Sequence, residues 1–384
     1  MRRTAILSWF LRALDAVDPR RLTAERLADR PPATVIAIGK AAVGMVTGAA
    51  DAWGRVRGVC VADAPGDVPE GIEILVGDHP IPGAASFAAG RRVLDVARES
   101  DQVVVLLSGG GSALCEWPLP GITPEFIAET TRALLNGGAS IGETNLVRAH
   151  LSALKAGGLA RAAGPDLLTL VLMDVGSLGP EMVASGPTLG RGLSPEMAIE
   201  VMRRYGIEPP PDVVDAIEEV PADPVSSPVE VIADGRDAGE AMVEAARLDG
   251  LDAYLSDGWI EGAVPQAVDR FLDESDRGVM VGAGEATLEV SGDGRGGRNT
   301  HAALEAAVRI SGQDIEFAAL STDGVDGASG AAGAIVDGTT ITRGGDPTAA
   351  LAAFDSATYL ERIGDLVVTG RTGTNVADLW VVWR

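Results

Sequence analysis

A run of small residues directly after an aliphatic stretch is the first feature of the sequence that could hold an anion. Val104–Leu107 is followed by Ser108, Gly109, Gly110, Gly111 and Ser112. Three consecutive glycines allow backbone N–H groups to converge on a phosphate or carboxylate, and the serine hydroxyls can add hydrogen bonds. The sequence contains no G-x-x-x-x-G-K-[ST] motif, so the chain is not a P-loop NTPase. A plain glycine turn between strand and helix is the alternative interpretation.

The chain contains very few lysines, and one of them lies where it could bind an anion. Of 31 basic residues only Lys40 and Lys155 are lysines. Lys40 follows Gly39 at the predicted turn from a strand into a helix, where the helix N-terminus can hold an anion. Because a cation is unfavourable at a helix start unless it faces an anion, we expect Lys40 to be functional.

A third segment places a carboxylate at the end of a predicted strand. Asp174 follows Leu168–Met173, which makes it a candidate magnesium ligand, and helix capping is the alternative explanation. Ser185, Gly186 and Thr188 lie in a later Ser-Gly-Pro-Thr turn. The hydroxyls and amides of this turn could contribute to the same phosphate site.

The C-terminal half carries two glycine-rich segments with charged side chains. The segment that starts at Gly292 satisfies G-x-G-x-x-G, which favours a dinucleotide site, although the pattern is common. Arg298 follows it at a predicted helix start and suits forked binding of a carboxylate or phosphate. Asp323 and Asp326, in a later loop, could bind magnesium or accept a hydroxyl proton. Asx turns explain such D-G pairs without any function.

The composition sets the fold class and excludes several kinds of partner. A chain of 384 residues with 46% hydrophobic and only 4% aromatic residues suits a two-domain α/β fold with aliphatic cores. The net charge of -24 disfavours nucleic acid and anionic membranes as partners. The two cysteines lack disulfide or zinc-ligand spacing, and we expect them to be buried. Residues 1–17 are predicted to form an amphipathic helix rather than a signal peptide, which favours a cytoplasmic protein.

Two α/β series are predicted along the chain, as domains of residues 1–224 and 225–384. The first is a Rossmann-like, mostly parallel sheet with helices on both faces, and the second is a smaller α/β domain. The strands expected in the first series are Thr34–Ile38, Gly58–Ala62, Glu73–Val76, Gln102–Leu107 and Leu168–Met173, with helices at Ala41–Trp53, Ala84–Arg98, Pro124–Leu135 and Thr144–Ala156. The strands expected in the second are Val229–Ala233, Ala253–Leu255, Gly278–Gly282, Ala286–Val290, Glu316–Leu320, Ala334–Val336, Leu366–Thr369 and Leu379–Trp383.

Taken in order, these segments resemble the glycerate 2-kinase family with its C-terminal MOFRL domain, whose older members were labelled hydroxypyruvate reductases. The matching stretches are G-K-A-A, G-D-H-P-I-P, S-G-G-G-S-A-L, N-L-V-R-A-H-L-S-A-L-K-A-G-G-L-A, A-S-G-P-T, G-G-R-N, T-D-G-V-D-G, A-A-G-A and T-G-T-N, and they extend from residue 39 to 375. The chain departs from the family in two places. Gly176–Leu178 replaces a segment with a carboxylate, and Arg371 stands where the family has proline.

The resemblance implies an enzyme that uses ATP and Mg²⁺ to phosphorylate the 2-hydroxyl of D-glycerate or a similar hydroxy acid. By the family match, Lys40, Arg298 and Asp323 are catalytic, and Asp326 joins Asp174 as a metal ligand. The match also implies that Arg298, Asn145 and Arg148 bind the substrate. The sequence leaves open whether the enzyme is a homodimer.

Two other functions remain open at this stage. The glycine pattern at Gly292 would suit an NAD(P)H-dependent hydroxypyruvate reductase. The change at Gly176–Leu178 would suit an anion-binding relative without catalytic activity.

Overall fold

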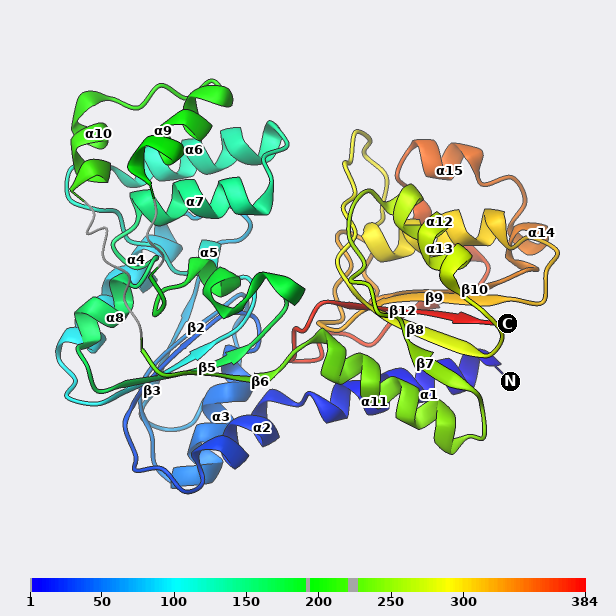
Figure 1. Ribbon diagram of the computed structural model, residues 1–384, viewed down its shortest axis with the longest axis horizontal. Helices are drawn as coiled ribbons and strands as arrows, with labels where there is room; N and C mark the ends of the chain where they lie inside the picture. Colours follow the sequence, from blue (N-terminus) through cyan, green and yellow to red (C-terminus); the bar gives the residue numbers. More distant parts are fainter. Residues whose placement is uncertain (1, 191–193, 220–226) are drawn as a thin grey trace. The chain divides into compact units, whose positions relative to one another are not determined.

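The computed structural model describes residues 2–190, 194–219 and 227–384, and the chain divides into two compact units (Figure 1). One, the parallel-sheet unit, is Pro19–Ile232. The other, the mixed-sheet unit, combines Ala233–Arg384 with the segment that ends at Asp18. The predicted boundary at residues 224 and 225 lies outside the described residues. The prediction placed all of residues 1–224 together, whereas α1 (Arg2–Ala16) belongs to the mixed-sheet unit.

The parallel-sheet unit has the strand order β3-β2-β1-β4-β5-β6, a doubly wound arrangement. The strands are β1 Thr34–Ile38, β2 Arg57–Ala62, β3 Ile72–Val76, β4 Val103–Leu107, β5 Leu167–Leu172 and β6 Val229–Ala233. The pairs β1–β2, β1–β4, β2–β3 and β4–β5 are parallel. Every residue of β1 and β4 is buried, which explains their uninterrupted aliphatic sequences.

The prediction that Val229–Ala233 opens the second series was wrong. This segment is β6, the edge strand beside β5 in the first sheet. Its first three residues are not buried, as is common for an edge strand. Sequence periodicity identified the strand but carried no information about which sheet it joins.

Helices cover both faces of the parallel sheet. α3 (Ala42–Trp53) packs with α2 (Pro19–Leu27) on one face, and α4 (Ala84–Arg98) packs with α8 (Gly158–Ala163) on the other (Figure 1). A separate helical layer has its own apolar core, which includes Ile127, Leu134, Val147, Met202 and Ile217. It consists of α6 Pro124–Asn136, α7 Ile141–Leu151, α9 Pro195–Arg204 and α10 Pro211–Glu218. The short elements α5 Gly111–Leu114, η1 Gly176–Leu178 and η2 Pro180–Ser185 lie in the connections.

The mixed-sheet unit has the strand order β11-β10-β9-β12-β8-β7. The strands are β7 Ala253–Leu255, β8 Val279–Gly284, β9 Glu316–Ser321, β10 Gly333–Asp337, β11 Leu366–Val367 and β12 Asp378–Trp383. β12 runs antiparallel to both β8 and β9, so its first residue lies beside their last residues. The predicted strand Ala286–Val290 does not form; Thr287 makes only an isolated bridge to Ala263, and Val290 is exposed.

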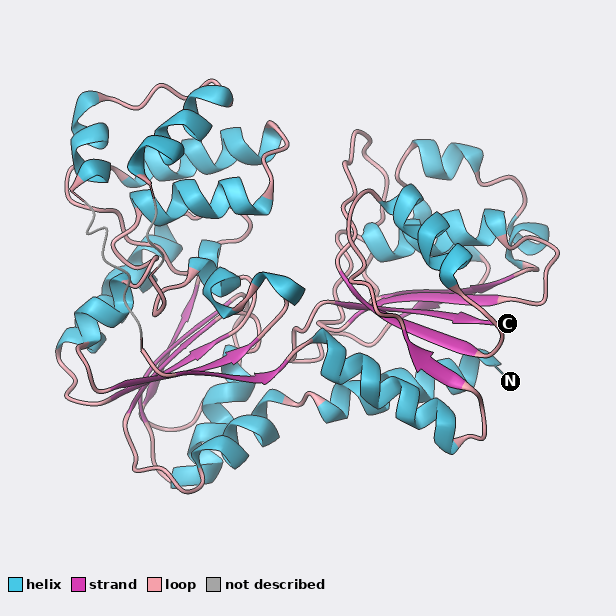
Figure 2. Cartoon of the chain, in the orientation of Figure 1, coloured by secondary structure: helices cyan, strands magenta, loops and turns pink. Residues whose placement is uncertain are grey.

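Helices also line both faces of this second sheet, as the cartoon shows (Figure 2). α1 and α11 (Gly235–Leu248) pack together on one face, and α12 (Val264–Glu274) and α13 (Arg298–Arg309) pack on the other. The rings of Phe271, Phe317 and Trp380 meet edge to face in the core on that side. The remaining helices are α14 Thr340–Gly344, α15 Thr348–Ala352 and α16 Ser356–Arg362. No helix among the described residues is long and apolar enough to cross a bilayer.

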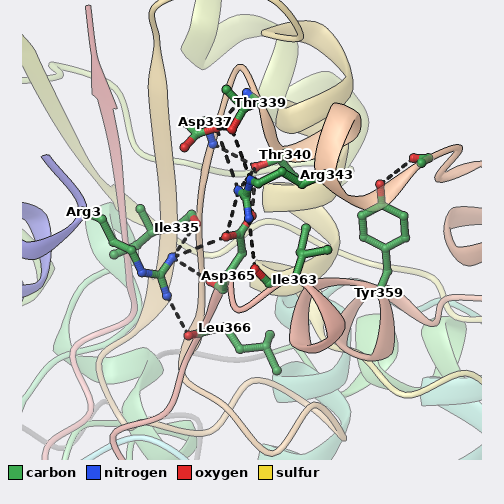
Figure 3. Close-up of polar contacts among 11 residues, drawn as sticks. Arg3, Ile335, Asp337, Thr339, Thr340, Arg343, Tyr359, Ile363, Asp365 and Leu366 are labelled. Carbon is green, nitrogen blue, oxygen red and sulfur yellow. Dashed lines mark hydrogen bonds and ion pairs between the residues drawn. The ribbon is translucent and has the colours of Figure 1, made fainter. Parts of the chain in front are cut away.

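The amphipathic helix predicted at the N-terminus is confirmed as α1, and specific contacts fix it to the mixed sheet. Trp9 is fully buried, donates to Asp249 over 2.7 Å and packs at 5.1 Å from the ring of Trp383. The Arg3 guanidinium donates to the carbonyls of Ile335 over 2.7 Å and Leu366 over 2.9 Å, at the β10–β11 edge (Figure 3).

A buried carboxylate completes this anchor. Asp365 accepts hydrogen bonds from Arg343 over 2.7 Å and from Thr340 over 2.9 Å, and Arg3 reaches its backbone carbonyl over 3.2 Å (Figure 3). The two guanidiniums therefore satisfy the side chain and main chain of the residue that precedes β11.

Replacing Arg3 should destabilise the mixed-sheet unit. We expect Arg3→Ala to lower the free energy of unfolding by about 1 kcal/mol, because the carbonyls lose the hydrogen bonds of a partly buried guanidinium. Urea unfolding followed by tryptophan fluorescence measures this change. Arg12→Ala on the exposed face of the same helix is the control, and equal losses in both variants would contradict the anchoring role.

Candidate active site

In the parallel-sheet unit, Lys40 and the triple-glycine loop meet where β1 and β4 end side by side. The Lys40 amide donates to the Gly109 carbonyl over 3.0 Å, and the Ala41 amide donates to Ser108 Oγ over 3.0 Å. Gly39 has a φ of 126°, and a Cβ there would collide with Ser108. A Cβ on Gly110 would lie 3.2 Å from Lys40 Cγ, so the lysine side chain runs along the triple-glycine loop. The structure thus brings two sequence-predicted segments together at the carboxyl ends of neighbouring strands.

A chain of hydroxyls connects the glycine loop to the turn after η2. Ser112 Oγ lies 2.5 Å from Ser185 Oγ, which donates to Asn145 Oδ1 over 2.9 Å. Ala184 and Ser185 have φ values of 51° and 60°, a conformation that costs non-glycine residues energy and is concentrated at functional sites. Ser112, Ser185 and Asn145, predicted separately from the sequence, therefore form one network.

The other residues predicted for this site differ in accessibility. Thr188 is buried, and its hydroxyl accepts a hydrogen bond from Thr169 on β5 over 2.9 Å. This position fastens the turn to the sheet and argues against a phosphate-binding role for Thr188. Gly186, with a φ of 63°, accepts from the Gly157 amide over 2.8 Å. Asp174 follows β5 and is half-buried, and its metal-binding role stays a prediction.

Two further cations of the parallel-sheet unit, Lys155 and Arg148, are buried. Lys155 and Glu116 are each 1% exposed and form an ion pair, and Ser152 donates to the same carboxylate. Burial lowers the pKa of Lys155, and the charge of Glu116 opposes that shift. Arg148 is 7% exposed, donates to the Pro80 carbonyl over 3.5 Å, and its Nε has no partner in the described part of the chain. Glu116 was not predicted from the sequence, although its partner Lys155 is one of only two lysines.

A cavity of about 370 Å³ opens beside this network, and sequence analysis did not predict it. It lies between the helical layer and the turn that carries Ser185. Its lining residues are Gly142, Glu143, Asn145, Leu146, Ala149, Ala156, Glu181, Met182, Ser185, Leu189, Met197, Val201 and Arg204.

In the mixed-sheet unit, charged residues gather at the edge where β8 and β9 end and β12 begins. Arg298, the first residue of α13, binds Asp378 through Nε over 2.5 Å and Nη2 over 3.1 Å, and Nη2 also contacts Glu285. Burial would lower the pKa of Arg298, but the charges of Asp378 and Glu285 raise it well above its ordinary value. Glu285 and Asp378 were not predicted, because single acids beside strands are common in an acidic sequence.

The two predicted carboxylates of the T-D-G-V-D-G loop have different surroundings. Asp326 is 2% exposed and accepts from the amides of Asn299 over 2.9 Å and Thr300 over 2.8 Å, which caps α13. Both of its oxygens are used in this way, which argues against a metal-ligand role. Asp323 Oδ1 accepts from Ser321 Oγ over 2.7 Å and from the Val325 amide over 2.8 Å.

No group of three or more histidine, cysteine, aspartate or glutamate side chains among the described residues could hold a metal ion. Both cysteines are buried, as predicted, and burial raises the pKa of each thiol to about 12. A magnesium ion needs few protein carboxylates when phosphate oxygens supply the remaining ligands. The half-buried Asp174 fits that mode better than Asp326.

The G-x-G-x-x-G segment has a packing role in this fold. A Cβ on Gly292 or Gly294 would collide with the backbone of Ala353, and the Gly294 amide donates to that carbonyl over 3.1 Å. The segment does not follow its strand directly, because β8 ends at Gly284. The glycines thus allow the loop to pack against the α15–α16 connection, which disfavours the dinucleotide interpretation.

Comparison with known proteins finds two family models in the chain. A domain of unknown function, DUF4147, matches residues 5–218, and the MOFRL family matches residues 278–378. The D-glycerate 2-kinase of Thermotoga maritima is 35% identical, over 96% of this chain and 95% of that protein. A putative hydroxypyruvate reductase of Agrobacterium vitis is 37% identical, over 96% and 91%. The crystal structure of a Thermotoga maritima glycerate kinase matches with a TM-score of 0.86 and 33% identity, over 99% of this chain and 98% of that one.

The burial of the Asp326 carboxyl should make stability depend on pH. Burial raises the pKa of Asp326 to about 6, so the folded state favours the protonated carboxyl. This contribution to stability is complete below the ordinary pKa near 4 and is lost as the pH rises through about 6. We expect the free-energy advantage of the wild type over Asp326→Asn to shrink from pH 5 to 7.5, measured by urea unfolding. Parallel pH profiles would contradict this assignment.

Proposed function

The chain belongs to the glycerate 2-kinase family, and from that premise we propose that it transfers the γ-phosphoryl group of ATP to the 2-hydroxyl of D-glycerate, releasing 2-phosphoglycerate and ADP. The observation that carries the proposal is the position of Lys40 along the triple-glycine loop. A cation beside converging amides and hydroxyls, at the carboxyl ends of parallel strands, is an arrangement that binds phosphate groups.

Phosphoryl transfer makes limited demands on the protein. The transition state is loose, so catalysis comes from positioning the reactants and neutralising the charge on the transferred group. In this proposal the amides of Gly109–Gly111 and the hydroxyls of Ser112 and Ser185 hold phosphate oxygens, and Lys40 offsets the charge of the transferred group. The strained backbone at Ala184 and Ser185 keeps the two hydroxyls in place before ATP arrives.

The mixed-sheet unit supplies the groups for the hydroxy acid. Asp378 and Glu285 hold Arg298 by Nε and Nη2, and Nη1 makes no hydrogen bond within the described residues. We assign Nη1 to the glycerate carboxylate, since the two acids fix the plane of the guanidinium. Asp323 accepts the proton of the attacking hydroxyl, and Ser321 orients its carboxylate.

The remaining predicted residues take modified roles in this proposal. Asn145 was predicted to bind the hydroxy acid, and its bond to Ser185 supports a role beside the nucleotide in this proposal. Arg148 is buried beside Pro80 and would act by positioning neighbouring groups rather than by contact. Mg²⁺ would be held by Asp174 together with the nucleotide, and when bound it neutralises phosphate charge.

One experiment separates this function from the alternatives. Purified protein is incubated with ATP, Mg²⁺ and a panel of hydroxy acids, ADP release is followed, and phosphorus NMR identifies the product. We expect release with D-glycerate and a phosphomonoester on the 2-hydroxyl. NAD(P)H consumption with hydroxypyruvate and no ADP release would establish a reductase, and ATP binding without turnover would establish a non-catalytic relative.

Lys40 should be essential for turnover but not for folding. We expect Lys40→Ala to lower kcat by about 10²–10³-fold, the scale of losing one electrostatic donor to the transition state. Arg55→Ala, an exposed cation of the same unit, is the matched control and should retain wild-type kcat. Full activity of Lys40→Ala, with the fold verified by circular dichroism, would refute the assignment.

The forked shape of Arg298 should matter as well as its charge. We expect Arg298→Lys to lower kcat/KM for D-glycerate by roughly 10–100-fold, because a lysine cannot bridge Asp378 and also bind the substrate carboxylate. The KM for ATP should stay unchanged. Steady-state kinetics with each substrate varied in turn would test this, and a rise confined to the KM for ATP would contradict the assignment.

A further inference from the structure

The cavity beside Ser185 has the size and wall chemistry of a small-molecule site. Its volume of about 370 Å³ falls within the usual range for ligand pockets. Apolar side chains form most of its walls, with Leu146 and Ala149 on α7, Met197 and Val201 on α9, and Met182 and Leu189 from the segment between them. Two facing helices and a connecting turn thus leave a slot with apolar sides, which suits a flat ring more than a small anion.

This cavity and the proposed phosphate site share one residue, Ser185. Ser185 lines the cavity and also lies 2.5 Å from Ser112, the last residue of the predicted phosphate loop. A ligand that fills the cavity and extends past Ser185 would therefore reach the glycine loop and Lys40. Of the molecules in the proposed reaction, only a nucleotide combines a planar apolar end with an anionic end.

Polar groups in the cavity are few and are placed to orient a ligand. Asn145 is more than nine-tenths buried, and its carbonyl oxygen accepts from Ser185. Its amide Nδ2 has no hydrogen-bond partner within the described residues, and Asn145 is one of the residues that line the cavity. Glu143 and Glu181 line the same cavity. Arg204 also lines the cavity, but it forms an ion pair with Glu143. The converging amides of the glycine loop and Lys40 therefore remain the better site for the anionic end of a nucleotide.

We propose that this cavity holds the nucleobase and ribose of the nucleoside triphosphate, so that the parallel-sheet unit alone binds the nucleotide. The base lies between α7 and α9, and the Nδ2 group of Asn145 donates to the base or ribose. This inference rests on the proposed kinase function. It adds a specific location for the part of the nucleotide that takes no part in the chemistry.

Comparing ATP with inorganic tripolyphosphate tests the proposal. Tripolyphosphate carries the same phosphate chain without a base, so it should depend on Lys40 but not on the cavity. Ala149→Phe on α7 would fill the slot. We expect it to raise the Kd for ATP at least about tenfold by calorimetry, as expected for blocking a well-formed apolar pocket, and to leave the Kd for tripolyphosphate within about twofold of the wild type. Lys40→Ala should weaken both ligands.

A second variant guards against misfolding of Ala149→Phe. Met197 is 57% exposed, so Met197→Ala should fold normally and raise the Kd for ATP several-fold. Leu135→Ala, an exposed truncation on α6 outside the cavity, is the matched control and should bind both ligands as the wild type does.

The outcomes distinguish the two proposals. Unchanged ATP affinity in both cavity variants, or a rise confined to the KM for D-glycerate, would overturn the nucleobase assignment and leave the kinase proposal intact. Failure of the wild type to bind ATP and tripolyphosphate at all would overturn both.

Discussion

The close approach of Gly39 to Ser108 is the contact on which the proposed phosphate site depends. The turns after β1 and β4 meet there through backbone atoms, and no side chain fits between them at Gly39. This contact places Lys40 along Gly110 and the Ala41 amide against Ser108. Parallel neighbouring strands supply the geometry, since both turns start from the same sheet edge. One glycine thus allows two loops that are far apart in the sequence to form the single surface proposed to bind phosphate.

Carboxylate partners fix two of the cations in this protein, which has a net charge of -24. Arg298 is held by Asp378 and Glu285, and Lys155 is paired with Glu116. The first pair keeps a guanidinium charged and oriented at a sheet edge. The second is buried, and loss of either partner would leave a buried charge without compensation. In each unit, therefore, the position of this cation is fixed by the neighbouring carboxylates and not by the net charge of the protein.

Local sequence patterns predicted most elements but not their tertiary partners. The limits of β1, β4 and α4 follow from aliphatic runs and helical periodicity, which are local properties. The sheet that β6 joins and the unit that α1 joins depend on contacts between residues far apart in the chain. Dependence on long-range contacts also explains why only part of the candidate site was predicted. Lys40 and the glycine loop can be recognised from residue type and spacing alone. Glu285 and Asp378 can be recognised as site residues only from their contacts with Arg298.

The helix at the start of the chain has a consequence for how the protein is made. α1 packs against α11 and the ring of Trp383, so its binding surface is formed by residues that are synthesised after the whole parallel-sheet unit. During translation the apolar face of α1, with Trp9 and Phe10, must wait while all of the parallel-sheet unit emerges from the ribosome. The parallel-sheet unit can form first, since its own residues are contiguous. A ribosome-bound intermediate of this protein therefore carries a finished domain and an exposed apolar helix, the kind of segment that chaperones hold.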